Sequence, residues 1–362
     1  MLFRSNPCGS RWETVSFDLA TAAARIAGKR ILVTGAGGTI GSELCRQLAL
    51  VKPSTLIMLG RGENRIFAIE QEIMADHPGL DIVTVINNLR EPERLEKVMR
   101  RLAPDVVYHT AAHKHVHYME RDPEEAVMNN VAATINLARS IEECGTERFV
   151  FISTDKAADP RGVMGATKRL VEMYLRKIDP DNSCRFMTVR FGNVIGSTGS
   201  VVPLFVDQIG RGGPVTVSDP GATRYFMTVK EASLLVIQAS VSGKGGETYI
   251  LDMGEAPNIL EMARDIIILT GHEPVEEIPI VYTGLREGEK LHEVLVGDDE
   301  TLEPPAPGEK IMLARSPSVT GDTFRADVDT LVEAARTGDR EGVLRLMSDL
   351  IPGFGDDPGQ SS

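Results

Sequence analysis

A glycine-rich segment, TGAGGTIG at residues 34–41, constrains the fold of this chain more than any other feature. It follows the β-rich run RILVT and precedes IGSELCRQLAL, in which apolar residues recur at helical spacing. Gly35 permits a tight turn, Gly38 permits a close backbone approach, and a helix beginning near Thr39 directs its free N–H groups at the same point. Gly41 completes the G-x-x-G-x-x-G spacing. A glycine motif alone is weak, but this one lies between a strand and a helix and therefore predicts a dinucleotide pyrophosphate site.

Strand-like and helix-like segments alternate along the next 150 residues. We expect strands at residues 55–60, 82–87, 105–111, 148–154 and 185–194, with helices between them. This alternation predicts an α/β fold with a doubly wound parallel sheet. From about Pro203 the alternation breaks into short strands, turns and two helices, at 228–240 and 258–271. We divide the chain into an N-terminal extension with one helix (1–27), a dinucleotide-binding domain (28–202), a smaller substrate-binding lobe (mainly 203–350, interleaved with the first domain) and a flexible tail (351–362).

Composition excludes several classes of protein. The net charge of −13 argues against nucleic-acid binding, because a phosphate backbone needs a basic surface. No apolar run approaches the ~18 residues of a membrane span, and the first residues lack the apolar core of a secretion signal. The four cysteines have no zinc-site spacing, which favours a reduced cytoplasmic protein.

The end of the second expected strand bears on the choice of cofactor. NAD-binding sites usually carry an acid there, which accepts a hydrogen bond from the ribose 2′-hydroxyl. Here Gly60 takes that position and Arg61 follows, and a guanidinium can pair with a 2′-phosphate. We therefore expect NADP in preference to NAD; the alternative is that Arg61 lies in solvent or stacks on adenine. Asn88, after the third strand, is expected to accept a hydrogen bond from the adenine amino group.

A loop rich in basic residues follows the strand that ends at His109. It carries His113, Lys114 and His115, and Asn129 or Asn130 from the next helix is expected to brace it. The lysine between the histidines argues against a metal site, and no carboxylate completes a ligand set. We predict no metal and place this loop beside the cofactor, at the carboxyl edge of the sheet.

Several motifs in a fixed order resemble one enzyme family. They are VTGAGGTIGSEL, AAHKHV, STDKA with MGATKRL, RFGNVIGS, SDPGATRYFMT and GLREGEKLHE. They are similar to the extended short-chain dehydrogenase/reductases and, more narrowly, to the CapD-like nucleotide-sugar 4,6-dehydratases of polysaccharide biosynthesis. The resemblance covers about Gly28 to Leu295. Many relatives have an N-terminal membrane region, which we do not expect in this chain.

The resemblance implies a reaction and its acid–base groups. A 4,6-dehydratase oxidises C4 of a UDP-linked hexose, eliminates water across C5 and C6, and returns the hydride to C6. By resemblance, Thr154 holds the C4 hydroxyl, Asp155 protonates the departing C6 hydroxyl and Lys156 removes the C5 proton. These roles require a lowered pKa at Lys156, which burial and the nearby Lys168 would favour, and a raised pKa at Asp155.

Met164 stands where a Y-x-x-x-K signature has its tyrosine, four residues before Lys168. A thioether has no proton to exchange, so we expect Met164 to pack and Lys168 to bind the nicotinamide ribose. Three alternatives are left for the group that assists oxidation at C4. They are Thr154 with a bound water, Asp155 in addition to its role as the acid, and Lys156 in addition to its role as the C5 base.

The remaining motifs are expected to bind cofactor or substrate. The expected cofactor contacts are Gly35, Gly38, Thr39, Ile40, Gly41, Arg61, Asn88, Leu89, Ala111 and Lys168. The expected substrate contacts are Lys114, His115, Asn193, Val201, Pro203, Arg224, Arg286 and Glu289. Arg224 and Arg286 could clamp a diphosphate, and Glu289 could accept from a sugar hydroxyl; for either arginine the alternative is a surface ion pair.

The resulting expectation is a UDP-N-acetylglucosamine 4,6-dehydratase with a tightly bound, recycled NADP or NAD, working as a homodimer or higher homo-oligomer. A nucleotide-sugar 4-epimerase is the alternative enzyme, although epimerases normally keep the tyrosine and need no Asp-Lys pair. A catalytically silent NADP-binding sensor is the alternative from another class, suggested by Met164.

Overall fold

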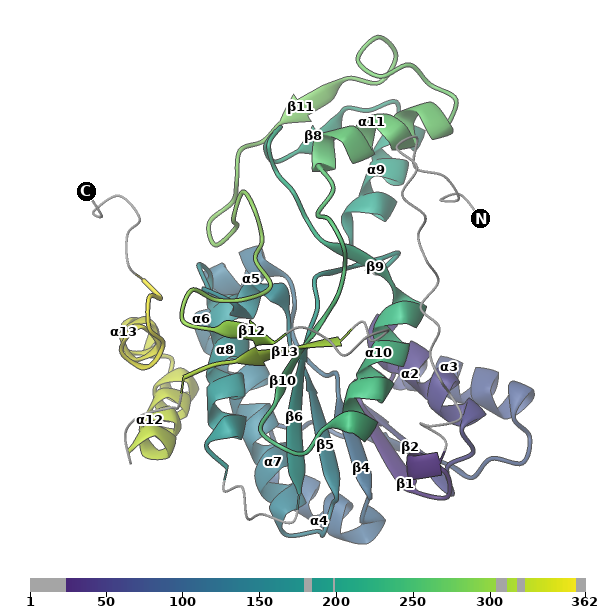
Figure 1. Cartoon of the computed structure of the whole chain (residues 1–362), viewed down its shortest axis with the longest axis vertical. Coiled ribbons are helices and arrows are strands. Elements are labelled where there is room, and N and C mark those ends of the chain that lie inside the picture. Colours follow the sequence, from purple (N-terminus) through teal and green to yellow (C-terminus); the bar gives the residue numbers. More distant parts are fainter. Residues whose placement is uncertain (1–23, 179–183, 198, 304–310, 318–322, 356–362) are drawn as a thin grey trace.

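A mixed sheet forms the centre of the molecule (Figure 1). The computed structural model describes residues 24–178, 184–197, 199–303, 311–317 and 323–355. Within them, seven parallel strands lie in the order β3 (Ile82–Ile86), β2 (Thr55–Gly60), β1 (Arg30–Thr34), β4 (Val106–His109), β5 (Arg148–Ile152), β6 (Arg185–Arg190) and β10 (Thr248–Leu251). The antiparallel strands β13 (Ile311–Arg315) and β12 (Thr301–Glu303) extend the β10 edge. The predicted doubly wound α/β fold is confirmed, with the 3-2-1-4-5-6 strand order of dinucleotide-binding domains.

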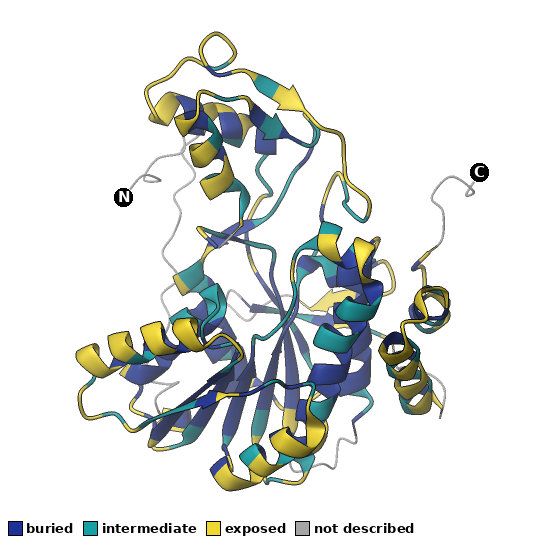
Figure 2. Ribbon diagram, turned by 180° about the vertical axis from the view of Figure 1, so that it is seen from behind, coloured by how far each residue is buried: buried dark blue, intermediate teal, exposed yellow. Residues whose placement is uncertain are grey.

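Helices cover both faces of this sheet, which is why the strands are almost continuously apolar. On one face, Leu32 and Ile57 pack with α4 (Pro92–Leu102), α7 (Ala133–Glu142) and α8 (Val163–Arg176). On the other face, Ile31 and Val33 pack with α2 (Thr39–Leu50), α3 (Glu63–Asp76) and α10 (Val229–Ser242). Figure 2 shows the buried strands between exposed outer helix surfaces.

The smaller lobe lies beyond the carboxyl end of the parallel strands (Figure 1). It contains α9 (Val201–Gly210), β8 (Val215–Val217), α11 (Ile259–Leu269) and β11 (Ile280–Tyr282), around a core of its own. The paired strands β7 (Asn193–Ile195) and β9 (Phe226–Thr228) connect it to the large domain. The expected single strand 185–194 is therefore wrong: the chain leaves the sheet after Arg190 and pairs again at Asn193 in another sheet. Since α10, β10, β12 and β13 join the large domain, residues 203–350 contribute to both parts.

The chain ends in a helical pair against the large domain. Short helices α5 (Val116–Arg121) and α6 (Pro123–Ala126) and a π-helical turn, η1 (Val127–Ala132), precede α7; α12 (Phe324–Thr337) and α13 (Arg340–Leu350) pack on this region (Figure 1). Ile351 and Phe354 are buried in the same core. The prediction of a flexible tail from residue 351 therefore placed the start of that tail too early. Residues 356–362 lie outside the described residues.

Only the end of the expected N-terminal helix is described. Residues 24–26 are helical, and Ile26 is fully buried in the same core as Ile31 and Val33. Residues 1–23 lie outside the described residues. No helix in the described part of the chain is long and apolar enough to cross a membrane.

Candidate active site

The glycine motif has the geometry that its spacing predicts. Gly35 has φ of +67°, and a Cβ there would lie 2.8 Å from the backbone nitrogen of Ala111. A Cβ on Gly41 would lie 2.2 Å from the Gly35 carbonyl oxygen, so only glycine lets α2 approach the turn this closely. Gly38 precedes α2 in extended conformation and supplies no side-chain cap, so the helix presents its first turn, from Thr39 through Ile40, to an anion.

The end of β2 lies beside this motif, and the end of β3 lies beside the end of β2. Arg61 is exposed, and no hydrogen bond or ion pair with another described residue is found for it. The Asn88 side chain accepts from the backbone N–H of Arg90 at 3.3 Å, and Leu89 is buried. Asn87, which sequence reasoning missed, donates its backbone N–H to Gly60, and its buried side-chain amide has no partner among the described residues. An unpaired amide and an uncapped helix fit a bound dinucleotide.

The basic loop before α5 is braced by Asn130 rather than Asn129. The Asn130 side chain accepts from the His113 N–H at 2.8 Å and donates to the His113 carbonyl at 3.0 Å. Lys114 reaches Ser197 at 3.4 Å, and His115 lies against Gly199, so both approach the loop that follows Asn193. Within the described residues no three His, Cys, Asp or Glu side chains are grouped as metal ligands.

Thr154, Asp155 and Lys156 form one hydrogen-bonded turn at the carboxyl end of β5, the 3-10 helix η2 (Asp155–Ala157). The Asp155 side chain is fully buried. Its Oδ1 accepts from the Thr154 hydroxyl at 2.8 Å, from the Lys156 backbone N–H at 2.9 Å and from Lys156 Nζ at 3.1 Å. Its Oδ2 has no partner among the described residues. The turn therefore brings together the three side chains to which the family resemblance gives roles: Thr154 for holding the C4 hydroxyl, Asp155 as the acid and Lys156 as the base.

Glu293 is the member of this cluster that sequence reasoning missed. Its Oε1 lies 3.3 Å from Lys156 Nζ and 3.8 Å from Arg224 Nε, and its buried Oε2 has no partner among the described residues. Burial lowers the pKa of Lys156, but the carboxylates of Asp155 and Glu293 together outweigh it and raise that pKa above its ordinary value. The lowered pKa expected from sequence is therefore wrong for the protein without ligands, because a second carboxylate faces the ammonium.

Glu293 belongs to the GLREGEKLHE motif, in which Arg286 and Glu289 were the expected site residues. Arg286 is exposed, and Glu289 accepts from its backbone N–H at 3.3 Å, so this pair is local. Arg224 donates to the carbonyls of Thr223 and Leu291, which places its guanidinium beside Glu293. The other expected substrate contacts lie in the lobe: Asn193 begins β7, and Val201 and Pro203 lie in the first turn of α9.

Helix α8 carries Met164 and Lys168 one turn apart. Met164 is buried in the apolar core, as expected for a packing residue. Lys168 Nζ donates to the Ile152 carbonyl at 2.9 Å and lies 4.5 Å from the centre of the Phe151 ring. Burial lowers the pKa of Lys168 to about 7, although Glu172 opposes this shift.

Comparison with known proteins shows the family of this chain. Residues 31–315 match the family described as polysaccharide biosynthesis protein. The chain belongs to this family. The capsular polysaccharide biosynthesis protein CapD of Staphylococcus aureus is 46% identical over 323 residues, covering 89% of this chain and 53% of CapD. The chain thus spans about half the length of the first curated relatives that it matches.

One further relative and one solved structure are also similar to this chain. The inverting UDP-N-acetylglucosamine 4,6-dehydratase of Campylobacter jejuni is 31% identical over 279 residues, covering 76% of this chain and 79% of that enzyme. The solved structure of Pen from Bacillus thuringiensis is 32% identical, with a TM-score of 0.73 over 81% of this chain and 89% of Pen. Less similar nucleotide-sugar epimerases and dehydratases, some solved with NAD, share the fold.

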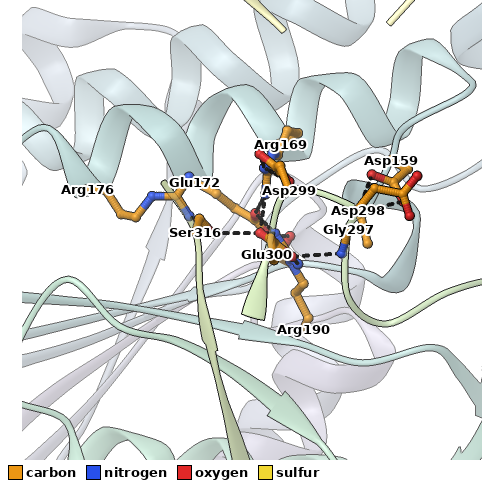
Figure 3. Close-up of polar contacts among 12 residues, drawn as sticks. Asp159, Arg169, Glu172, Arg176, Arg190, Gly297, Asp298, Asp299, Glu300 and Ser316 are labelled. Atoms are coloured by element: carbon orange, nitrogen blue, oxygen red, sulfur yellow. Dashed lines mark hydrogen bonds and ion pairs between the residues drawn. The ribbon is translucent and has the colours of Figure 1, made fainter. Parts of the chain in front are cut away.

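Next to Ser153, the residue before the hydrogen-bonded turn at the end of β5, the chain contains a buried ion cluster that sequence reasoning also missed (Figure 3). Arg190, at the end of β6, donates to Glu172 in α8 and to Glu300 before β12. Glu300 also accepts from Arg169 and from Ser316. Salt bridges to these arginines lower the pKa of Glu300 far enough to overcome its burial. The cluster ties the segment after Glu293 to the strands and helix that carry the turn.

Proposed function

We propose that this chain is a nucleotide-sugar 4,6-dehydratase acting on UDP-N-acetylglucosamine. The observation that carries the proposal is the hydrogen-bonded turn of Thr154, Asp155 and Lys156 at the carboxyl edge of the sheet. An epimerase has no need of a buried carboxyl group bonded to a lysine at this point, whereas elimination of water needs both an acid and a base. The 31% identity to the Campylobacter enzyme supports the choice of substrate.

The residues of the turn divide the chemistry. A nicotinamide cofactor, when bound, supplies the hydride chemistry at C4 and C6. Thr154 holds the C4 hydroxyl, Lys156 takes the proton from C5, and Asp155 protonates the hydroxyl that leaves C6. The contacts of Asp155 Oδ1 with the Thr154 hydroxyl and with Lys156 Nζ support these roles. The carboxylate can receive a proton at Oδ1 and deliver one from Oδ2, which has no partner among the described residues.

We propose NADP as the preferred cofactor and NAD as the alternative. The uncapped start of α2 would hold the pyrophosphate, and the exposed Arg61 would pair with a 2′-phosphate. Lys168, beneath the carboxyl end of β5, would bond the nicotinamide ribose. For the substrate, Lys114, Arg224 and Arg286 would meet the diphosphate, and Glu289 a sugar hydroxyl. We also propose a homo-oligomer, which light scattering of the purified chain would measure.

Incubation with UDP-N-acetylglucosamine and either cofactor in D2O tests the function. The expected product, followed by NMR, is a UDP-linked 4-keto-6-deoxy sugar with deuterium at C5. A product epimerised at C4 that keeps its C6 hydroxyl would replace the dehydratase with an epimerase. Cofactor binding without turnover of any UDP-hexose would favour the silent sensor.

A further inference from the structure

The chain leaves the turn of residues 154–156 in an unusual conformation. Ala158 directly follows η2 and is fully buried. Asp159, the next residue, has φ of +44°, in the left-handed region that residues other than glycine rarely adopt. Such a conformation persists only where surrounding contacts hold it. The contacts of these two residues therefore determine where the end of the turn lies.

Both residues are held by a distant segment that begins in the GLREGEKLHE motif. Lys290, in this motif, donates from Nζ to the Ala158 carbonyl at 2.9 Å. The Asp159 carboxylate accepts from the backbone N–H of Asp298 at 3.1 and 3.2 Å (Figure 3). Asp298 contributes only its backbone to this bond, whereas Lys290 contributes its side chain. Lys290 is thus the side chain of this segment that fixes the carbonyl at the end of the turn.

The position of this carbonyl bears on the whole turn. Ala157 and Ala158 donate their backbone N–H groups to the carbonyls of the residues three positions earlier, at 3.1 and 3.0 Å, and so close the turn. A shift of the Ala158 carbonyl therefore moves the peptide groups that carry the Asp155 and Lys156 side chains. The hydrogen bond from Lys290 opposes such a shift.

The same segment also holds the Lys156 side chain. Glu293 Oε1 lies 3.3 Å from Lys156 Nζ, and the Glu293 side chain is only 2% exposed. Lys156, Lys290 and Glu293 line one small pocket. The segment thus fixes Lys156 twice: through its side chain, by an ion pair with Glu293, and through its backbone, by the hydrogen bond of Lys290 to the end of the turn.

We propose that Lys290 is a positioning residue, which keeps Asp155 and Lys156 in the arrangement that elimination of water requires by holding the Ala158 carbonyl. The inference rests on the proposed dehydratase function. Lys290 transfers no proton in this assignment, and the roles of Asp155 and Lys156 stay as proposed. Glu289, an expected substrate contact, is adjacent to Lys290 in the chain. The segment expected to meet the substrate is therefore also the segment that places the turn.

Steady-state kinetics test the proposal. Lys290→Met keeps an apolar stem of similar length and removes the donor. Its kcat and kcat/KM for UDP-N-acetylglucosamine should fall together by about 10²-fold with KM unchanged, because a misplaced acid and base weaken only the transition state. Lys290→Arg keeps a donor and should retain most of the kcat, and Lys97→Met, exposed in α4, should match wild type. An unchanged kcat in Lys290→Met, or a raised KM at constant kcat, would overturn the proposal.

The pH profile separates position from charge. Lys290 is also a cation in the pocket of Lys156, and removing a cation would raise the pKa of Lys156 and weaken it as a base mainly at low pH. A displaced turn is displaced at every pH, so the loss of kcat in Lys290→Met should be constant from about pH 6 to 9. A loss that disappears at the upper end of this range would make the effect electrostatic and contradict the positioning role.

Hydrogen exchange reports the turn without turnover. Measured by mass spectrometry on the protein without substrate, the amides of Ala157 and Ala158 should exchange faster in Lys290→Met by about tenfold or more, with the sheet amides unchanged. Unchanged exchange at these two amides, or faster exchange throughout the protein with no excess at the turn, overturns the inference. A wild type inactive on UDP-N-acetylglucosamine overturns the proposed function, while the exchange still decides whether Lys290 holds the turn.

Discussion

The hydroxyl of Ser153 donates a hydrogen bond of 2.6 Å to the buried carboxylate of Glu172. Ser153 directly precedes the turn of Thr154, Asp155 and Lys156, and Glu172 lies one helical turn beyond Lys168 in α8. The same carboxylate accepts from Arg190 at 2.7 Å. The turn is thus linked through Ser153 to the ion cluster of Figure 3.

Replacing Arg190 should destabilise the fold strongly. Arg190→Met removes one of the two arginines that contact both buried carboxylates, Glu172 and Glu300, and leaves, among the described residues, only Arg169 in contact with both. We therefore expect a loss of about 3–5 kcal/mol in the free energy of unfolding. Arg315→Met is the matched control, because its pair with Glu303 is exposed and should contribute less than about 1 kcal/mol. Urea denaturation measures both. Similar small losses in the two variants would show that the cluster is not needed for stability.

Lys168 makes stability depend on pH in a defined window. Its pKa falls from 10.5 in the unfolded chain to about 7 in the folded one, because burial disfavours the ammonium. Between these values the unfolded state binds more protons, so the cost of burying Lys168 is complete below about pH 7 and fades as the pH rises toward 10.5. Lys168→Met should therefore stabilise the cofactor-free protein by a few kcal/mol at pH 6 and little near pH 10.5. The same gain at both pH values, measured by urea denaturation, would contradict the shifted pKa.

Met164 should matter for stability and not for chemistry. Met164→Ala removes a buried side chain and should cost about 2–5 kcal/mol, while turnover of the folded fraction at low temperature should stay close to wild type. Met164→Leu conserves volume and should cost less than about 1.5 kcal/mol. If the alanine variant folds, binds cofactor and is inactive, this side chain has a role in the reaction.

Arg61 should control the choice of cofactor. Arg61→Ala should weaken NADP binding by about 1.5–3 kcal/mol through loss of a charge-assisted hydrogen bond, and leave NAD binding nearly unchanged. Isothermal titration with each cofactor measures both. A wild type that binds NAD more tightly than NADP would show that the end of β2 does not select the phosphate.

The two halves of the Asp155–Lys156 pair should fail at different steps. Lys156→Ala lacks the C5 base, so reduced nicotinamide should accumulate with a 4-keto sugar that keeps its C6 hydroxyl. Asp155→Asn cannot deliver a proton, so water loss should slow by ~10²–10⁴-fold. Single-turnover absorbance and C5 exchange report the two steps separately. If neither variant oxidises C4, the Asp155–Lys156 pair performs the proton transfer that the missing tyrosine would perform. If C5 exchanges at the wild-type rate in Lys156→Ala, Lys156 is not the C5 base.

Local sequence was sufficient for the parallel sheet, the glycine turn and the position of Thr154, Asp155 and Lys156. Each depends on short-range patterns: apolar periodicity, glycines that alone tolerate a close turn, and polar residues directly after a strand, where the carboxyl edge must lie. The packing role of Met164 likewise follows from its chemistry. The same local reasoning made the strand at 185–194 too long, because the break at residues 191–192 depends on the pairing of Asn193–Ile195 with β9 and not on the segment itself.

Only the tertiary structure decided which distant groups meet at the turn. Glu293, Arg190 and Glu300 belong to segments far from Asp155 in the chain, and nothing in these segments marks the three residues as partners. Burial gives these charges their importance, because a carboxylate removed from water must find a cation or a hydrogen bond. The raised pKa of Lys156 has the same origin: it reflects the sum of burial and two carboxylates, and the second carboxylate comes from the smaller lobe's connection to the large domain. Contacts of this kind depend on how the two parts pack, which no local pattern encodes.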